Sequence, residues 1–244
     1  MAQSPLDRPA FYALAPGRWR DLVTLLHPPY TAWHLSYVAL GAAAAPTLHA
    51  DRLAATLAAF FLGVGICAHV LDELNGRPLA TGISDRALGA LAALSLAGAI
   101  ALGVIGVATV GASLVPFIAA GAFIVVAYNL ELFGGRFHTD FWFAAAWGAF
   151  PALTAYWANA VSLAPAGVLV ALSCFALSVA QRRLSTPVRT LRRRTAAVTG
   201  TQTLDDGTTV ELTRAILAAP LDGALRAIAA GLVLLAAGLV IVRL

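Results

Sequence analysis

Three side chains that can hold a metal ion or move a proton stand together near the end of an apolar stretch. His69, Asp72 and Glu73 follow residues 53–68, in which Thr56 carries the only hydroxyl or charged group. On a helix, positions i, i+3 and i+4 share one face. A carboxylate at the bilayer centre costs roughly 2.5–3.5 kcal/mol on insertion scales, so such groups face a bundle interior or a watery cavity. The spacing therefore predicts a polar site embedded in the bundle.

The residues directly after this helix predict a loop folded over the site. Asn75 and Gly76 both tolerate a left-handed backbone and are expected to end the helix. Arg77 precedes Pro78, which biases it away from the α region toward an extended turn. A second polar loop is expected at residues 131–140, between two apolar helices.

The whole chain is far more apolar than a soluble domain. Of its 244 residues, 60% are hydrophobic and 11% are charged, and the mean hydropathy is +0.82. These values predict an all-α polytopic membrane protein. Cys67 and Cys174 both fall in apolar helices and are expected to be buried thiols. No fold-sized basic domain is present, which argues against a nucleic-acid partner.

Apolar runs predict about seven spans in a single transmembrane domain over residues 31–244, preceded by a cytoplasmic tail over residues 1–30. Residues 199–213 alternate around an Asp-Gly pair, which predicts a small cytoplasmic β-hairpin. The expected spans are residues 31–48, 53–74, 88–108, 114–130, 141–161, 165–180 and 222–244.

The distribution of arginine predicts the orientation. A cytoplasmic N-terminus puts all of the arginines except Arg52 and Arg243 on the cytoplasmic side, which satisfies the positive-inside rule. We therefore expect a multi-pass protein of the inner (plasma) membrane. The polar loops then face one compartment, so that they could form one site. The basic segment from Arg182 to Arg194 is expected to set topology and to attract anionic lipid, at about 1 kcal/mol per residue.

A run of short motifs lies between the second and third expected spans. Asp72 is followed by Arg77-Pro78-Leu79 and then by Gly82-Ile83-Ser84, just before the next helix. Across residues 31–100 this order resembles the UbiA-type intramembrane prenyltransferases, whose helical bundles carry an aspartate-rich motif at the cytoplasmic end of the second helix. The chain is identified as a divergent member. At the family's second acidic motif, residues 178–183 contain no acid.

The resemblance implies an enzyme that acts on an isoprenoid diphosphate, by transfer of the chain to a lipophilic acceptor or by cyclisation. Mg²⁺ prefers one or two carboxylates together with phosphate oxygens and water, and arginine clamps phosphate. Asp72 and Glu73 are then the expected catalytic residues and magnesium ligands. The expected substrate-binding residues are Asn75, Arg77, Arg136 and Arg182.

Two other functions remain open from the sequence. Imidazole and carboxylate groups suit Zn or Fe, which would make the protein a membrane metalloenzyme. A non-catalytic protein that binds lipid or quinone would keep the bundle without a second acidic motif. His34, near the start of the first expected span, is expected to be a core residue. The candidate metal ligands are His69, Asp72, Glu73, Glu131 and His138.

Overall fold

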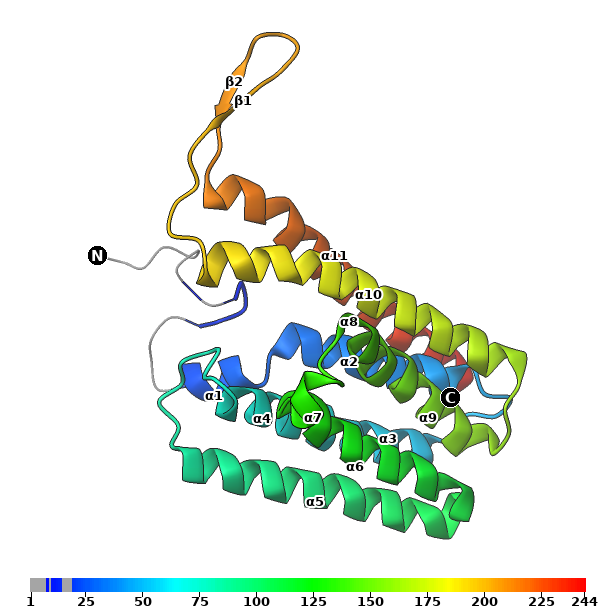
Figure 1. Ribbon diagram of the computed structural model, residues 1–244. Helices are drawn as coiled ribbons and strands as arrows, with labels where there is room; N and C mark the ends of the chain where they lie inside the picture. Colours follow the sequence, from blue (N-terminus) through cyan, green and yellow to red (C-terminus); the bar gives the residue numbers. More distant parts are fainter. Residues whose placement is uncertain (1–7, 9, 15–18) are drawn as a thin grey trace.

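The computed structural model describes residues 8, 10–14 and 19–244. Most of this chain forms a bundle of long helices that run side by side (Figure 1). The helix α1 and a two-stranded hairpin lie at one end of the bundle, and the C-terminus lies at the other. The elements are α1 (Arg20–Leu25), α2 (Pro28–Ala43), α3 (Ala50–Phe60), η2 (Phe61–Ala68), α4 (His69–Leu74), α5 (Asp85–Val110), η3 (Ala112–Leu114), α6 (Val115–Asn129), α7 (Leu132–Gly135), α8 (Asp140–Phe143), η4 (Ala144–Ala149), α9 (Phe150–Ala160), α10 (Pro165–Arg193), β1 (Thr201–Thr203), β2 (Thr209–Glu211) and α11 (Arg214–Arg243).

Five helices are long and apolar enough to cross a membrane, and they match five of the seven expected spans. The expected first span, residues 31–48, is instead the 16-residue helix α2, which ends at Ala43 and is shorter than the about 20 residues that a span needs. The expected fifth span is the continuous helix over residues 140–160, which is likewise not among the five. Seven crossings are therefore not confirmed. The five helices are Ala50–Leu74, Asp85–Val110, Ala112–Asn129, Pro165–Arg193 and Arg214–Arg243.

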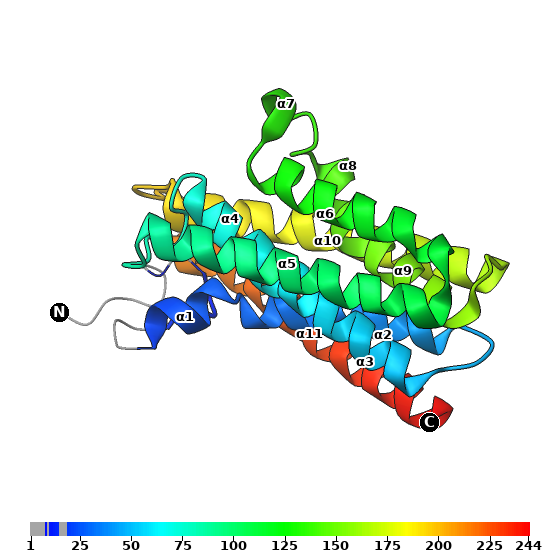
Figure 2. The ribbon, with the colours of Figure 1, turned by 90° about the horizontal axis from the view of Figure 1, so that it is seen from below.

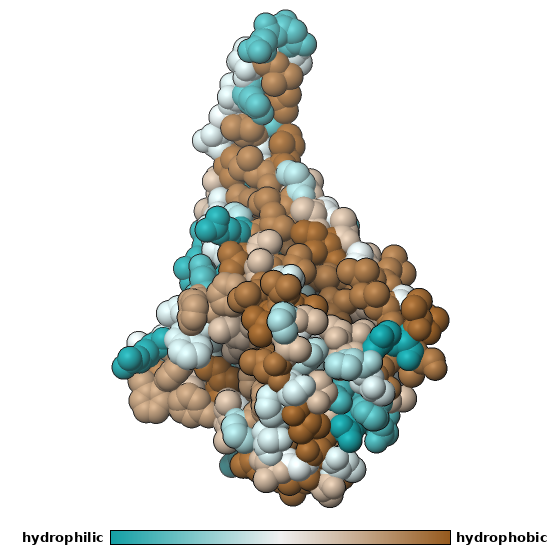
Figure 3. Space-filling model, turned by 90° about the vertical axis from the view of Figure 1, so that its right-hand side faces the viewer, coloured by the Kyte–Doolittle hydropathy of each residue, from teal (hydrophilic) through white to brown (hydrophobic). Residues whose placement is uncertain are grey.

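The outer surface of the bundle is apolar, as a lipid-facing surface must be. Leu94 on α5 and Leu234 on α11 each expose 72% of their surface, and Leu169 on α10 exposes 63%. Figure 3 views one end of the bundle, where hydrophobic areas are mixed with hydrophilic patches, and it shows a hydrophilic tip on the hairpin. Exposed apolar surface on this scale marks contact with something other than water. Together with the five apolar helices, it identifies a membrane protein.

The short helix α2 lies inside the bundle, where it packs against α9 and α11. Trp33 and Tyr37 are fully buried on it, and the Trp33 indole N–H donates to the Tyr37 hydroxyl. Gly41 allows close approach, because an added Cβ would lie 2.0 Å from the carbonyl oxygen of Ala152. In Figure 2, α5 lies along the opposite side of the bundle, over α3 and α4, which it contacts. The helix α2 is thus packed closely against its neighbours.

Two of the helices contain a π-helical segment, and both segments contact α2. The segment η2 interrupts the helix over residues 50–74, and η4 interrupts the helix over residues 140–160. A π turn widens the helix and redirects the side chains that follow it, and such turns occur frequently at functional sites. Each segment here lies next to residues of the polar cavity described below.

The predicted hairpin is confirmed. Strands β1 and β2 pair antiparallel, with Thr201 opposite Glu211. Gly207 takes a φ of +83° in the turn, a conformation that glycine adopts at no steric cost. The hairpin connects α10 to α11 and extends away from the bundle (Figure 1).

Candidate functional site

Glu73 holds the loop that follows α4. Its side chain is fully buried, and its two carboxylate oxygens accept the backbone N–H groups of Leu79 at 2.9 Å and Thr81 at 2.8 Å. A buried carboxylate with two charge-assisted bonds is satisfied where it stands. The expected pairing of Asp72 with Glu73 at one magnesium ion does not match this geometry, because only Asp72 lines the polar cavity described below.

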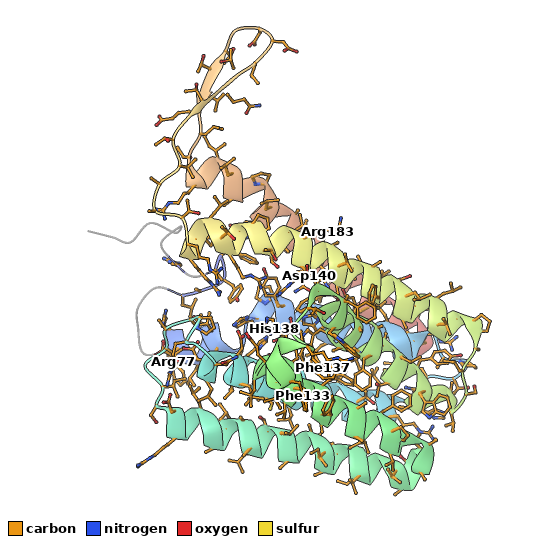
Figure 4. The ribbon with its side chains drawn as sticks, in the orientation of Figure 1. Arg77, Phe133, Phe137, His138, Asp140 and Arg183 are labelled. Carbon is orange, nitrogen blue, oxygen red and sulfur yellow. The ribbon has the colours of Figure 1, made fainter. Side chains whose placement is uncertain are left out.

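Arg77 also stabilises the loop after α4. Its backbone is left-handed, with a φ of +53°, and its guanidinium donates to the carbonyl oxygen of Ile83 at 2.7 Å and pairs with Asp85. Figure 4 shows Arg77 at the end of the bundle, whereas His138 lies further toward the middle. Arg77 does not line the cavity, and neither does the exposed Arg136. The structure therefore places these two expected substrate-binding residues outside the site.

The helix α1 fastens the same loop from the other side. Arg20 donates to the carbonyl oxygens of Leu79 at 3.0 Å and Ala80 at 3.2 Å, and Asp21 accepts the N–H of Gly82 at 2.9 Å. The hydrogen bond from Arg20, followed by that from Gly82, holds the pKa of Asp21 below its usual value. This part of the expected cytoplasmic tail is therefore packed on the bundle; residues 1–7, 9 and 15–18 lie outside the described part of the chain.

A polar cavity of about 400 Å³ lies between α2, α4, α6, the 131–138 loop and α10. It brings together residues that the sequence predicted on separate segments, as expected if the polar loops form one site. Asn75 is fixed at its edge, where its side-chain amide donates to the carbonyl oxygen of Asn129 at 3.1 Å. The predicted site residues that line it are His69, Asp72, Asn75, Glu131, His138 and Arg182.

A basic stripe on α10, of which only Arg182 was a predicted site residue, lines the cavity. This helix was expected to end near residue 180, but it continues to Arg193. The positions of Arg182, Arg189 and Arg193, at i, i+7 and i+11, place all three on the face that lines the cavity. Arg182 also pairs with Asp140 at 2.8 Å, and Arg189 donates to Thr186 at 3.1 Å. The helical spacing of these arginines was the available signal.

Three histidines that line the cavity, His34, His69 and His138, share one hydrogen-bonding pattern. In each, Nδ1 is bonded to a backbone carbonyl oxygen. A carbonyl oxygen can only accept, so Nδ1 must carry the proton, and the neutral ring keeps a lone pair on Nε2. The cavity wall therefore contains three imidazoles with the same tautomer.

A proline frees the carbonyl that binds His34. In a regular helix the carbonyl oxygen of Trp147 would accept from the residue four positions later, but that residue is Pro151, which has no N–H. Nδ1 of His34 donates to the free oxygen at 2.8 Å. His34 is 5% exposed, as expected of a core residue, yet its ring lines the polar cavity.

The other two carbonyls lie at a helix irregularity and at a helix end. At the end of the π segment the backbone N–H of His69 bonds to Ile66, so the oxygen of Gly65 can accept Nδ1 of His69 at 3.1 Å. The oxygen of Tyr128 lies in the last turn of α6, where it accepts the backbone N–H of Glu131 at 3.3 Å and also Nδ1 of His138 at 3.0 Å. Each of the three rings is thus oriented by a carbonyl at a break or an end of a helix.

His27 differs from these three and was not among the predicted site residues. Its ring stacks on His69 with centroids 4.1 Å apart, and its Nδ1 lies 2.9 Å from the hydroxyl of Tyr12. Its Nε2 is buried without a partner among the described residues. Burial, followed by the charges of His69 and Arg193, lowers the pKa of His27 well below its usual value. Burial likewise raises the pKa of Tyr12.

No group of three His, Cys, Asp or Glu side chains suited to a metal ion is formed within the described residues. The expected Zn or Fe ligands are thus not assembled, since Glu73 belongs to the loop. Magnesium needs fewer protein ligands, because an ion bound to a diphosphate takes only one or two protein carboxylates. Asp72 lines the cavity and can supply one carboxylate, and Glu131 lies at its exposed edge.

An apolar groove of about 260 Å³ adjoins the polar cavity. Val64 and Trp147 line both, so these two residues stand between the two spaces, and we call this boundary the neck. The groove extends to Asp51 and Arg52, which lie at the start of α3. Its apolar walls include Phe60, Leu96, Ile100, Ile118, Val125 and Phe150.

No family model, curated protein or solved structure matches this chain. The resemblance to UbiA-type prenyltransferases therefore stays a prediction. The polar cavity and the apolar groove beside it are the features of the structure that bear on function.

We predict that Glu73→Gln destabilises the loop. The amide would present a donor to one of the two backbone N–H groups, and a hydrogen bond to a charged group contributes roughly 1.5–3 kcal/mol. The thermal melting temperature in detergent should fall clearly. The matched control is Glu131→Gln, an exposed carboxylate at the cavity edge, which should melt like the parent protein. Equal melting of the two variants would contradict the supporting role of Glu73.

Proposed function

We propose that the protein is an intramembrane enzyme that binds an isoprenoid diphosphate and transfers its chain to an acceptor. One observation carries the proposal: a polar cavity with arginines on its wall lies next to an apolar groove, and the two spaces share the lining residues Val64 and Trp147. A ligand that fills both spaces has an anionic head and a long apolar tail. An isoprenoid diphosphate has this chemistry.

The head of the ligand would bind the stripe on α10. Arg182, Arg189 and Arg193 line the cavity from one helix face, and guanidinium groups match phosphate oxygens in a forked geometry. Asp72 is the residue that would hold Mg²⁺ here, and the ion would supply positive charge to a leaving diphosphate. These cationic groups would favour departure of the diphosphate because they bind the charge that develops on it.

The tail would lie in the apolar groove. Burial of a lipid chain contributes about 0.8 kcal/mol per CH₂ group, so the groove needs no polar contact to hold an isoprenoid. Gly63 is among its lining residues and leaves room that a larger side chain would fill, since an added Cβ there would meet only the Cβ of Ala99, at 3.9 Å. The acceptor would be lipophilic too, since it has to reach the same neck from the membrane.

We further propose that the polar cavity faces the cytoplasm across an inner (plasma) membrane. The arginines of the cavity wall lie on the side that the positive-inside rule assigns to the cytoplasm. The two arginines on the opposite side are used to close helix ends. Arg52 donates to the carbonyl oxygen of Ala158 at 3.0 Å, and Arg243 to that of Ala45 at 2.6 Å.

Arg189→Ala should weaken binding of farnesyl thiolodiphosphate, a non-reacting analogue, by about tenfold to a hundredfold. The loss of one charge-assisted bond to phosphate is worth roughly 1.5–3 kcal/mol. Arg183→Ala is the control: it removes the same charge from the same helix, but its exposed side chain lies outside the cavity (Figure 4). Radioligand binding in nanodiscs measures both. Equal losses would show that only the overall charge matters.

Asp72→Asn should abolish Mg²⁺-dependent release of diphosphate from farnesyl diphosphate and leave the melting temperature unchanged, because asparagine keeps the shape and loses the charge. His69→Asn should be mild, since magnesium does not need imidazole. Labelled diphosphate is measured after incubation with purified protein. Full activity in Asp72→Asn would refute the magnesium role. Tight binding without turnover in the parent protein would instead favour a non-catalytic lipid-binding function.

The proposed orientation predicts which residues a membrane-impermeant thiol reagent reaches. In a protein without Cys67 and Cys174, Ser84→Cys should react only from the cytoplasmic side of oriented vesicles. Leu163→Cys, in the exposed turn before α10, should react only from the other side. Reaction of both from one side would overturn the orientation.

A further inference from the structure

The neck between the cavity and the groove is where the chemistry of the proposed function would occur. In an isoprenoid diphosphate the reacting carbon, C1, joins the polar head to the apolar tail. With the head in the cavity and the tail in the groove, C1 lies beside Val64 and Trp147, which line both. The arginines then lie on the head side of this carbon. A group that takes up a proton during transfer has to be sought at the neck.

His34 is attached to this neck. Its Nδ1 donates to the backbone oxygen of Trp147 at 2.8 Å, so its tautomer is fixed and the neutral ring keeps its lone pair on Nε2. Its Nε2 makes no hydrogen bond within the described part of the chain, and the ring lines the cavity. Tyr37 and Phe143 pack edge-on against the ring, each with centroids 6.0 Å away. The ring therefore cannot swing away from the neck.

We propose that His34 is the general base of the reaction and that the acceptor carries a hydroxyl group. The acceptor oxygen forms a bond to C1 while the bond from C1 to the diphosphate oxygen breaks, and the diphosphate leaves with that electron pair. The hydroxyl proton passes to Nε2 of His34. Atoms and charge balance without an oxidant or reductant. The inference rests on the proposed function and adds the base and the acceptor class.

The other two imidazoles of the same tautomer are less well placed. The ring of His138 stacks on Tyr128 with centroids 4.5 Å apart, and its Nδ1 lies 3.8 Å from the exposed carboxylate of Glu131, at the outer edge of the cavity. The ring of His69 is covered on one face by His27. Neither bonds to a residue of the neck. His138 therefore provides a control with the same chemistry at another place.

The test compares His34→Asn with His138→Asn. Asparagine places its amide N–H where Nδ1 stands, so it keeps the bond to the backbone oxygen and removes only the base. Farnesyl diphosphate labelled in the chain is incubated with Mg²⁺ and with either phenol or 4-nitrophenol, and aryl ether, farnesol and diphosphate are measured. Binding of farnesyl thiolodiphosphate and the melting temperature are recorded for each protein.

His34→Asn should bind the analogue and melt as the parent protein does, while transfer to phenol falls by about 10²–10⁴-fold. The more acidic 4-nitrophenol ionises without help, so the loss should be much smaller with this acceptor. Any loss in His138→Asn should be the same with the two phenols, because this ring lines the cavity but does not reach the neck. An active parent protein with an equally active His34→Asn, or equal losses with both phenols in that variant, would overturn the role of His34. A parent protein that releases neither diphosphate nor product would overturn the proposed function and the inference together.

Discussion

Every polar group inside an apolar bundle needs a partner within the protein, and this constraint organises the structure. A backbone carbonyl that loses its helical partner cannot hydrogen-bond to water inside the membrane. In this protein, side chains donate to such carbonyls instead. Pro151 frees the oxygen of Trp147, and the π segment η2 makes the oxygen of Gly65 accessible; each then accepts an imidazole N–H. The same hydrogen bond therefore satisfies the irregular backbone and fixes the orientation of the side chain.

The same constraint explains the motif between α4 and α5. The loop over residues 75–84 exposes backbone groups that no helix satisfies, and charged side chains satisfy them instead. Glu73 accepts from two of its N–H groups, Arg77 donates to two of its carbonyls, and Arg20 reaches it from α1. The charged residues of this motif therefore hold the loop beside the cavity, whereas the arginines that line the cavity come from α10.

Much of this arrangement could be predicted from the sequence, because hydropathy and turn chemistry are local. The apolar runs identify five long helices, and the Asp-Gly pair identifies the hairpin. The polar residues of α4 and of the 131–138 loop were expected to meet, and Asp72, Glu131 and His138 do line one cavity. Helix periodicity also placed Glu73 on the face of Asp72, but it could not reveal that backbone amides of the next loop approach that carboxylate.

What the sequence could not provide depends on contacts between distant segments. His34 looks like a core residue until the oxygen of Trp147 is known to lie beside it. His27 was not among the predicted site residues, and only the folded chain shows its ring stacked on His69. The arginines of α10 beyond Arg182 were assigned to topology and anionic lipid because the apolar window ends near residue 180, whereas the folded helix continues through Pro187 to Arg193.

The π segment η2 has a consequence for how the chain tolerates insertions and deletions. A π turn holds one residue more than an α turn, so it behaves as a single-residue insertion that the fold has kept. Removal of one residue from 61–68 would let an α turn take the place of the π turn, so the residues that follow would keep their facing and Asp72 and His69 would stay at the cavity. The same removal from the regular helix α3 has no extra residue to absorb it. Everything after that deletion would turn by about 100°, and His69 and Asp72 would leave the cavity although the protein would keep its hydropathy and nearly all of its sequence.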